Sequence, residues 1–194
     1  MSDTALTVIG MIAAFVTASV TAFFAEPVKL YFQNRDKLKS LRTALYKETI
    51  SNFVWLDFID HGNWDRDSDL SVKIVVDQIE PNLRDDCYRQ HIATQADTFY
   101  QLKEAILFGN LYGTLSNIHH FRDDAVTQEK QKEQGMVFSG LHTACRTYVF
   151  LVVGAFDDGT LDRGFLSEIV DDQTHRLVME RANRYHKRSS KGEG

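Results

Sequence analysis

Residues 4–25 read TALTVIGMIAAFVTASVTAFFA, a stretch of 22 residues without one charged side chain. A helix rises roughly 1.5 Å per residue, so this stretch would extend about 33 Å and could cross a hydrocarbon core of roughly 30 Å. Only Asp3 precedes it and FFAEP ends it, so the basic start and cleavage site of a secretory signal are missing. The sequence predicts an uncleaved membrane-spanning helix. The alternative is a buried core helix, which is usually shorter.

Basic residues follow this stretch at once. Residues 28–47 contain six Lys or Arg and one acidic residue, Asp36. Positively charged flanks stay in the cytoplasm, so we expect a single pass through a bacterial inner membrane with the N-terminus outside and the C-terminal domain in the cytoplasm. Four of these residues are expected to contact anionic lipid headgroups, at about 1 kcal/mol each; they are Lys29, Arg35, Lys37 and Lys39.

Small residues form a stripe along the predicted span. Gly10, Ala14, Ala18 and Ala22 recur every four residues, and a neighbouring row contains Thr17 and Thr21. Helices in lipid associate through close backbone approach and hydroxyl hydrogen bonds, so the stripe predicts an oligomer interface within the membrane. In enough copies its hydroxyl groups could line a polar lumen. The alternative is that Ala and Thr are simply common in membrane spans.

The remaining chain has the composition of one ordinary folded domain, with 43% hydrophobic residues and two prolines in the whole sequence. Apolar residues from Leu38 to Ile59 step by three, four or a multiple, which predicts that the membrane helix continues to about Asp60. We therefore expect an all-α fold, in which a single N-terminal transmembrane helix continues into a cytosolic four- or five-helix bundle. The predicted parts are an anchor (1–27), a basic stalk helix (28–60), the bundle (61–188) and a disordered tail (189–194).

Further helices are expected within the bundle. Residues 61–69 read as a polar loop, after which a helix runs to Ile79 and is kinked or restarted at Pro81. The next is expected to begin at Thr94, as N-cap, and to reach Ile118. A long helix over 126–156 and a last one over 162–187 complete the prediction.

The charge distribution and the two cysteines make several functions of this chain less favourable. Residues 48–180 contain 23 Asp or Glu and 11 Lys or Arg, which disfavours broad non-specific binding to nucleic acid. The two cysteines, Cys87 and Cys145, lack the spacing of a zinc site, and we expect free thiols in a reducing cytoplasm. No cofactor is expected.

Two motifs contain residue types that bind metals, but neither has the spacing of a metal site. Asp65, Asp67 and Asp69 alternate as calcium ligands do, but Leu70 and Val76 stand where the loop needs Gly and Glu. His119 and His120 precede Asp123 and Asp124, but adjacent histidines on a helix point about 100° apart. A solvated helix end is the preferred interpretation there.

Three basic side chains are candidates for a ligand site or a subunit interface. His142 and Arg146 share a helix face four residues apart, and Arg184 lies in a basic cluster near the C-terminus. The preferred interpretation of His142 and Arg146 is a hydrogen-bonded polar pair at an interface. The alternative is recognition of a small anionic ligand, such as a cyclic nucleotide, at a subunit interface.

An Arg and a His separated by four to six residues occur twice, as Arg84 with His91 and as Arg181 with His186. Such a pair can cleave RNA, because imidazole moves a proton while guanidinium stabilises the phosphorane charge. With seven histidines in 194 residues, however, matches to so loose a spacing are expected by chance. Arg181 and His186 are the catalytic candidates.

In segment order, in length and in the stretch Arg181-Ala182-Asn183-Arg184-Tyr185-His186, the chain resembles CRISPR-associated accessory membrane proteins with one N-terminal span and a HEPN-like helical cytosolic domain. The resemblance covers most of the chain. It implies an oligomeric inner-membrane effector that acts during phage infection, with a CRISPR effector, RNA or a cyclic nucleotide signal as partners besides the lipid bilayer and other copies of itself.

Three functional hypotheses follow. The first is a non-enzymatic homo-oligomeric membrane effector in antiphage defence, acting by pore formation or membrane depolarisation. The second is a membrane-anchored sensor or adaptor for a small nucleotide. The third is a membrane-tethered HEPN-type ribonuclease.

Overall fold

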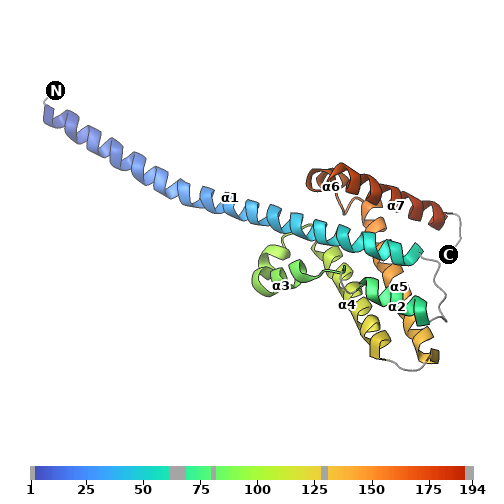
Figure 1. Ribbon diagram of the computed structural model, residues 1–194. Coiled ribbons are helices and arrows are strands. Elements are labelled where there is room, and N and C mark those ends of the chain that lie inside the picture. Colours follow the sequence, from blue (N-terminus) through green and yellow to red (C-terminus); the bar gives the residue numbers. More distant parts are fainter. Residues whose placement is uncertain (1–2, 62–68, 80–81, 128–130, 191–194) are drawn as a thin grey trace. The chain divides into compact units, whose positions relative to one another are not determined.

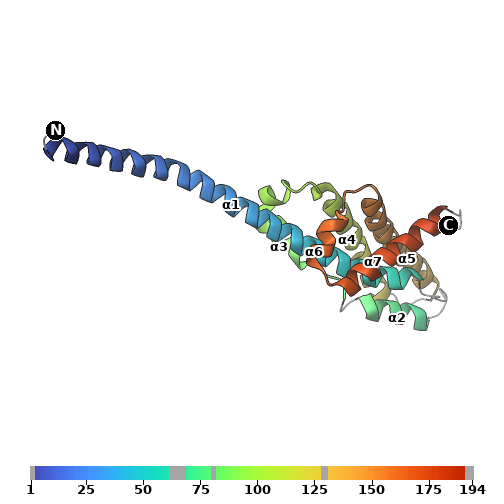
Figure 2. The same cartoon turned by 90° about the horizontal axis from the view of Figure 1, so that it is seen from above.

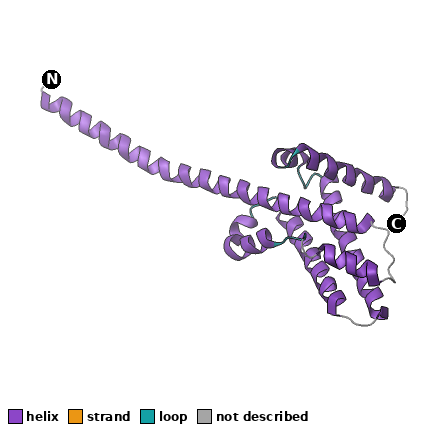
Figure 3. Ribbon diagram, viewed as in Figure 1, coloured by secondary structure: helices purple, strands orange, loops and turns teal. Residues whose placement is uncertain are grey.

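The structure, a computed structural model, describes residues 3–61, 69–79, 82–127 and 131–190. Side chains are described at residue 15 and over 25–61, 73–79, 82–127 and 135–187. These parts of the chain form seven helices and no strand, so the predicted all-α fold is confirmed (Figure 3).

The first helix, α1, runs from Asp3 to His61 and contains Pro27 (Figure 1). The expected continuation of the N-terminal helix to about Asp60 is therefore confirmed. The chain divides into two compact units, residues 1–40 and 41–194. The division falls inside the segment 28–60 that we assigned to a stalk, so residues 41–61 of α1 belong to the second unit.

The other helices are α2 (Asp69–Ile79), α3 (Asp86–Phe99), α4 (Ala105–Thr127), α5 (Gln131–Asp157), α6 (Arg163–Ile169) and α7 (Asp172–Ser190). The helix predicted to begin at Thr94 is found in part: Gln95 has non-helical backbone angles and divides α3 at this point, but the Thr94 hydroxyl donates to the Gln90 carbonyl instead of capping the stretch that follows. The predicted last helix is interrupted, since Val170 has extended backbone angles and separates α6 from α7. The expected polar loop falls mostly on residues 62–68, outside the described chain.

The core of the second unit is built on residues 41–61 of α1. Leu45, Phe53 and Leu56 are completely buried there, as the apolar spacing predicts. The longest helices of the bundle, α4 and α5, run antiparallel side by side (Figures 1 and 2). On the sides of α4 and α5 that face the core, large side chains are fully buried; they include Phe108, Leu111, Ile118, Phe138, Leu141 and Tyr148.

Side chains determine where several helices begin. The Glu48 carboxylate on α1 accepts hydrogen bonds from the backbone N–H of Cys87, at 2.9 Å, and of Tyr88, at 3.3 Å. These are first-turn donors of α3 that no carbonyl of that helix can satisfy. Asp162 caps α6 through the Phe165 N–H at 3.1 Å, and Asp171 caps α7 through the Thr174 N–H at 2.9 Å.

Among the described residues, one helix is long and apolar enough to cross a membrane, and it is Gly135–Asp157 within α5. A core helix passes the same test, and α5 buries Phe138, Leu141 and Tyr148 within the bundle. The predicted span, residues 4–25, is helical throughout. Its side chains lie outside the described set apart from Phe15 and Ala25, both of which are exposed.

Candidate functional site

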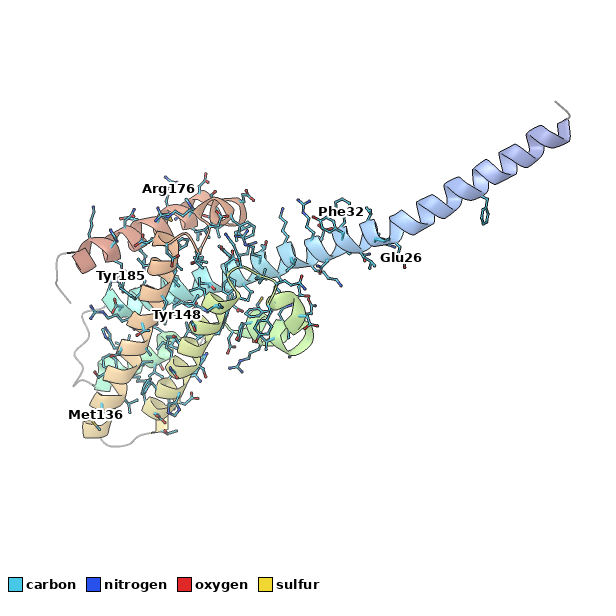
Figure 4. All side chains as sticks on the ribbon, turned by 180° about the vertical axis from the view of Figure 1, so that it is seen from behind. Glu26, Phe32, Met136, Tyr148, Arg176 and Tyr185 are labelled. Carbon is cyan, nitrogen blue, oxygen red and sulfur yellow. The ribbon has the colours of Figure 1, made fainter. Side chains whose placement is uncertain are left out.

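Ionisable side chains from α1, α5 and α7 meet near the C-terminal end of α1. We name this group the Asp57 cluster; its members are Asp57, Asp60, His61, His142, Arg181 and Tyr185. Figure 4 shows Tyr185, one of its members, among the side chains between α7 and the helices that it packs on. The two aspartates are nearly enclosed, with side-chain exposures of 3% for Asp57 and 9% for Asp60.

Arg181 of α7 donates to the Asp57 carboxylate and, at 3.4 Å, to the Val54 carbonyl. Burial raises the pKa of Asp57 above its usual value, although the positive charges of Arg181 and His61 oppose the shift. A buried carboxylate of this kind needs its cation, because removing one partner leaves an uncompensated charge. Arg181 is therefore engaged in holding α7 on α1.

The rest of the cluster joins α1 to the same two helices. The Tyr185 hydroxyl donates to Asp60, and the His142 Nε2 lies 3.7 Å from the other oxygen of that carboxylate. His61 Nδ1 lies 3.1 Å from the Asp57 carboxylate, and its ring meets the Tyr185 ring edge-on at 5.1 Å. The Asp57 Oδ1 and His61 Nε2 atoms are buried without a hydrogen bond.

The two catalytic candidates are not brought together. His186 is 70% exposed, and its Nδ1 lies 3.2 Å from the Asp157 carboxylate at the end of α5. Five residues along a helix correspond to a turn of about 140°, so Arg181 and His186 leave α7 in different directions. Because Arg181 is bound to Asp57 as well, the pair does not form a site in which imidazole and guanidinium act on one phosphate.

The second Arg and His pair has another environment. The Arg84 backbone is fixed by the Asn52 side chain, with bonds of 2.7 and 2.9 Å, while the Arg84 side chain is exposed. His91 is half-buried in α3, and its Nδ1 has no hydrogen-bond partner in the described chain.

The three candidates for a ligand or an interface fall in different places. His142 points toward Asp60 inside the bundle, whereas Arg146 is exposed on α5. Arg184 pairs with Glu180 one turn earlier on α7, at 2.6 Å. The expected pairing of His142 with Arg146 is not seen, because His142 belongs to the Asp57 cluster.

No described group of three His, Cys, Asp or Glu side chains is arranged to hold a metal ion. His119 and His120 lie within the regular helix α4. His120 pairs with Asp124 at 3.4 Å, and burial followed by the charge of Arg122 lowers the pKa of His119. Asp65 and Asp67 lie outside the described residues.

The membrane-related candidates belong to the first unit. Lys29, Arg35, Lys37 and Lys39 are all exposed. The side chains of the predicted oligomer interface lie outside the described set, which leaves this interface a prediction; its residues are Gly10, Ala14, Thr17, Ala18, Thr21 and Ala22.

A second polar group, which the sequence did not indicate, lies at the start of the bundle. Glu104 is fully buried, and its Oε1 accepts from the Arg42 Nε at 2.8 Å and from the Tyr46 hydroxyl at 2.9 Å. The Tyr46 oxygen in turn accepts from the Asp162 N–H at 3.0 Å, and burial raises the pKa of Tyr46 to about 12. Arg42 also lies over the Phe165 ring, 4.0 Å from its centre. These contacts tie α1 to the start of α4 and to α6.

One signal in the sequence could have indicated that α1 buries polar side chains. Glu48, Asn52 and Asp57 interrupt or border the apolar series of α1, and a carboxylate beside a core stripe must find partners if it is buried. The partners Arg84, Cys87 and Arg181 could not be predicted, because they lie 32 to 124 residues away in the sequence.

Comparison with known proteins adds no relative: no protein-family model, curated protein or solved structure matches this chain.

Proposed function

We propose that this protein is a single-pass inner-membrane protein whose copies associate within the bilayer, and that it acts as a homo-oligomeric membrane effector rather than as an enzyme. One observation carries the proposal: the uncharged residues 4–25 all lie inside the continuous helix α1. A segment in hydrocarbon must satisfy its backbone hydrogen bonds internally, and an unbroken helix does so. The exposed basic residues that follow suit a headgroup layer.

The mode of action that fits this proposal is pore formation or depolarisation. A chain with one span can enclose a lumen only by assembling with copies of itself, and the stripe of Gly, Ala and Thr offers the surface for close helix packing. The role in antiphage defence is supported by the resemblance to CRISPR-associated membrane proteins described above.

The geometry favours this function over a ribonuclease. Arg181, which a nuclease would need for phosphate, is bound to buried Asp57, and His186 pairs with Asp157 instead. The sensor hypothesis keeps one supporting observation, because Arg146 is exposed and pairs with no described carboxylate. A rise in melting temperature with a cyclic nucleotide, lost in Arg146→Ala, would support it.

The test of the proposal is the mass of the full-length protein in detergent, measured by light scattering and corrected for bound detergent. We expect a discrete assembly of at least four copies, which Ala14→Leu and Ala18→Leu dissociate. Phe15→Leu, outside the predicted stripe, is the matched control and should leave the mass unchanged. A monomer or dimer in the unmodified protein would contradict pore formation.

A further inference from the structure

The outer surface of the α4–α5 pair carries almost no charge. Residues 105–118 contain no Asp, Glu, Lys or Arg, and residues 135–156 contain only Arg146. Large apolar side chains are exposed on it, with Ile106 at 83% and Phe150 at 61%. We call this surface the α4–α5 face; it consists of Ile106, Asn110, Gly113 and Asn117 on α4 and Met136, Thr143, Thr147 and Phe150 on α5.

This composition is that of a protein interface. Interface cores are depleted in charged residues and enriched in Phe and Met, whereas the rest of the second unit is acidic. Met136, labelled in Figure 4, lies near the start of α5 and is 73% exposed. The large exposed side chains therefore extend along the length of α5 rather than standing at one point.

The face also has a hollow. An open groove of about 530 Å³ lies between the two helices, and its lining includes Gly140, Ala144 and Thr147. Phe150 stands seven residues from Thr143 on the same side of α5, which is about 10 Å along the helix. A surface with both a projection and a hollow can match a copy of itself about a twofold axis, as an isologous interface requires.

Glycines provide an independent argument for close approach. A Cβ built on Gly140 would lie 2.7 Å from the Phe121 ring, so packing inside the chain explains that glycine. A Cβ on Gly109, Gly113 or Gly154 would meet nothing within 4 Å, and of these three glycines Gly113 belongs to the α4–α5 face. Glycine inside a helix costs roughly 0.5–1 kcal/mol relative to alanine, and close approach of a second copy at Gly113 would offset this cost.

We infer that the α4–α5 face docks on the same face of a second copy of this chain. A basic partner would find no carboxylate on it, and an acidic partner would find only Arg146. A second copy brings an equally uncharged surface, and face-to-face docking keeps the acidic surfaces apart. The inference does not require that α1 span a membrane, because every residue of the face lies in the second unit.

Thiol cross-linking of the full-length protein in native membranes tests the inference. Thr147, which lies between the groove and Phe150, falls near the twofold axis, so Thr147→Cys should form a disulfide-linked dimer on mild oxidation, while Val126→Cys should not. Val126 is also exposed on α4, at 66%, but lies about 140° around that helix from Gly113. The unmodified chain gives the background from Cys87, which is half-buried, and Cys145, which is buried.

Two further variants separate docking from folding. Phe150→Glu should raise the dimer dissociation constant roughly tenfold or more, because it removes an aromatic contact at the centre of the interface. Val126→Glu, outside the face, is the control and should leave the constant unchanged. Gly113→Ala should raise the melting temperature of the separated chain yet weaken the dimer, a combination that damaged folding cannot give.

The outcomes separate this face from the proposed membrane interface. Cross-linking of Thr147→Cys that survives Ala14→Leu and Ala18→Leu supports the α4–α5 face even if the bilayer assembly fails. Absence of that cross-link, in protein whose mass still falls on Ala14→Leu, overturns the inference and leaves the membrane assembly standing. A fluorophore can also be attached to the new thiol of Thr147→Cys. If spin-labelled lipid quenches this fluorophore, the face lies against lipid and the inference is overturned.

Discussion

The single helix α1 contains two stretches that resemble each other in secondary structure and differ in surface. Residues 25–37 are exposed on every side, and they include Val28, Leu30 and Phe32. Residues 41–61 bury an apolar stripe together with Glu48, Asn52 and Asp57. The difference shows that a helix packed on other helices can bury charge when those helices supply partners, whereas the stretch 25–37 keeps charged residues such as Lys29 and Arg35 exposed.

Two phenylalanines on α1 give the largest expected contrast. Phe53 is completely buried and Phe32 is 52% exposed. Phe53→Ala should lower the free energy of unfolding by about 3–5 kcal/mol, because it opens a cavity in the core. Phe32→Ala should change it by less than about 0.5 kcal/mol. Chemical denaturation in detergent measures both, and equal losses would mean that the two stretches are not different in kind.

The buried ion pair of the Asp57 cluster gives the next largest effect. Arg181→Ala should destabilise the protein by about 3–5 kcal/mol at neutral pH, because it leaves Asp57 charged and buried. Arg184→Ala on the same helix removes an exposed pair and should cost no more than about 1 kcal/mol.

The loss in Arg181→Ala should depend on pH in a defined direction. The pKa of Asp57 is already raised by burial, and removing Arg181 raises it further. The free energy of unfolding of the variant therefore falls relative to that of the parent as pH rises through the pKa of Asp57 in the folded parent. The part of this difference that comes from Asp57 disappears at low pH, where Asp57 is protonated in both proteins. Denaturation at pH 4 and pH 7 checks this, and a loss of the same size at both would exclude Asp57 as the cause.

The basic side chains of the exposed stretch should have a smaller effect. Lys29, Arg35, Lys37 and Lys39 are each expected to contribute about 1 kcal/mol at an anionic membrane surface. Substitution of all four residues by glutamine should lower the fraction of chains whose C-terminal domain faces the cytoplasm. Labelling of a new cysteine near the C-terminus of Cys87→Ser chains measures this fraction. An unchanged orientation would mean that these charges do not set the topology.

The smallest effect is expected at His186. This side chain is 70% exposed and pairs with an exposed carboxylate, so His186→Ala should change stability by less than about 0.5 kcal/mol. Membrane activity should be retained. Loss of RNA cleavage by the variant, from a parent that cleaves RNA, would restore the nuclease hypothesis.

The sequence predicted what depends on local periodicity. The spacing of Leu45, Phe53 and Leu56 indicated the buried side of α1, and its end near Asp60 was found at His61. Prediction from the sequence failed where side chains far apart in the sequence determine the structure. The start of α3 depends on Glu48, which lies 39 residues before Cys87 and accepts a hydrogen bond from its N–H. Thr94, which the sequence predicts as an N-cap, donates its hydroxyl to the Gln90 carbonyl instead.

The candidate site shows the same limit. The sequence spacing groups Arg181 with His186, but the partner of Arg181 in the structure is Asp57 on another helix. The spacing likewise groups His142 with Arg146, whereas His142 lies beside Asp60. Spacing along one helix identifies residues on a face and cannot reveal which opposing helix supplies the counter-charge.

Extraction of membranes with alkaline carbonate tests the central claim, that residues 4–25 anchor this chain in a bilayer. The full-length protein should stay with the membrane pellet, and a variant with Val16→Asp and Val20→Asp should be released, since each carboxylate costs about 3 kcal/mol near the centre of a span. Release of the unmodified protein into the supernatant would contradict the claim.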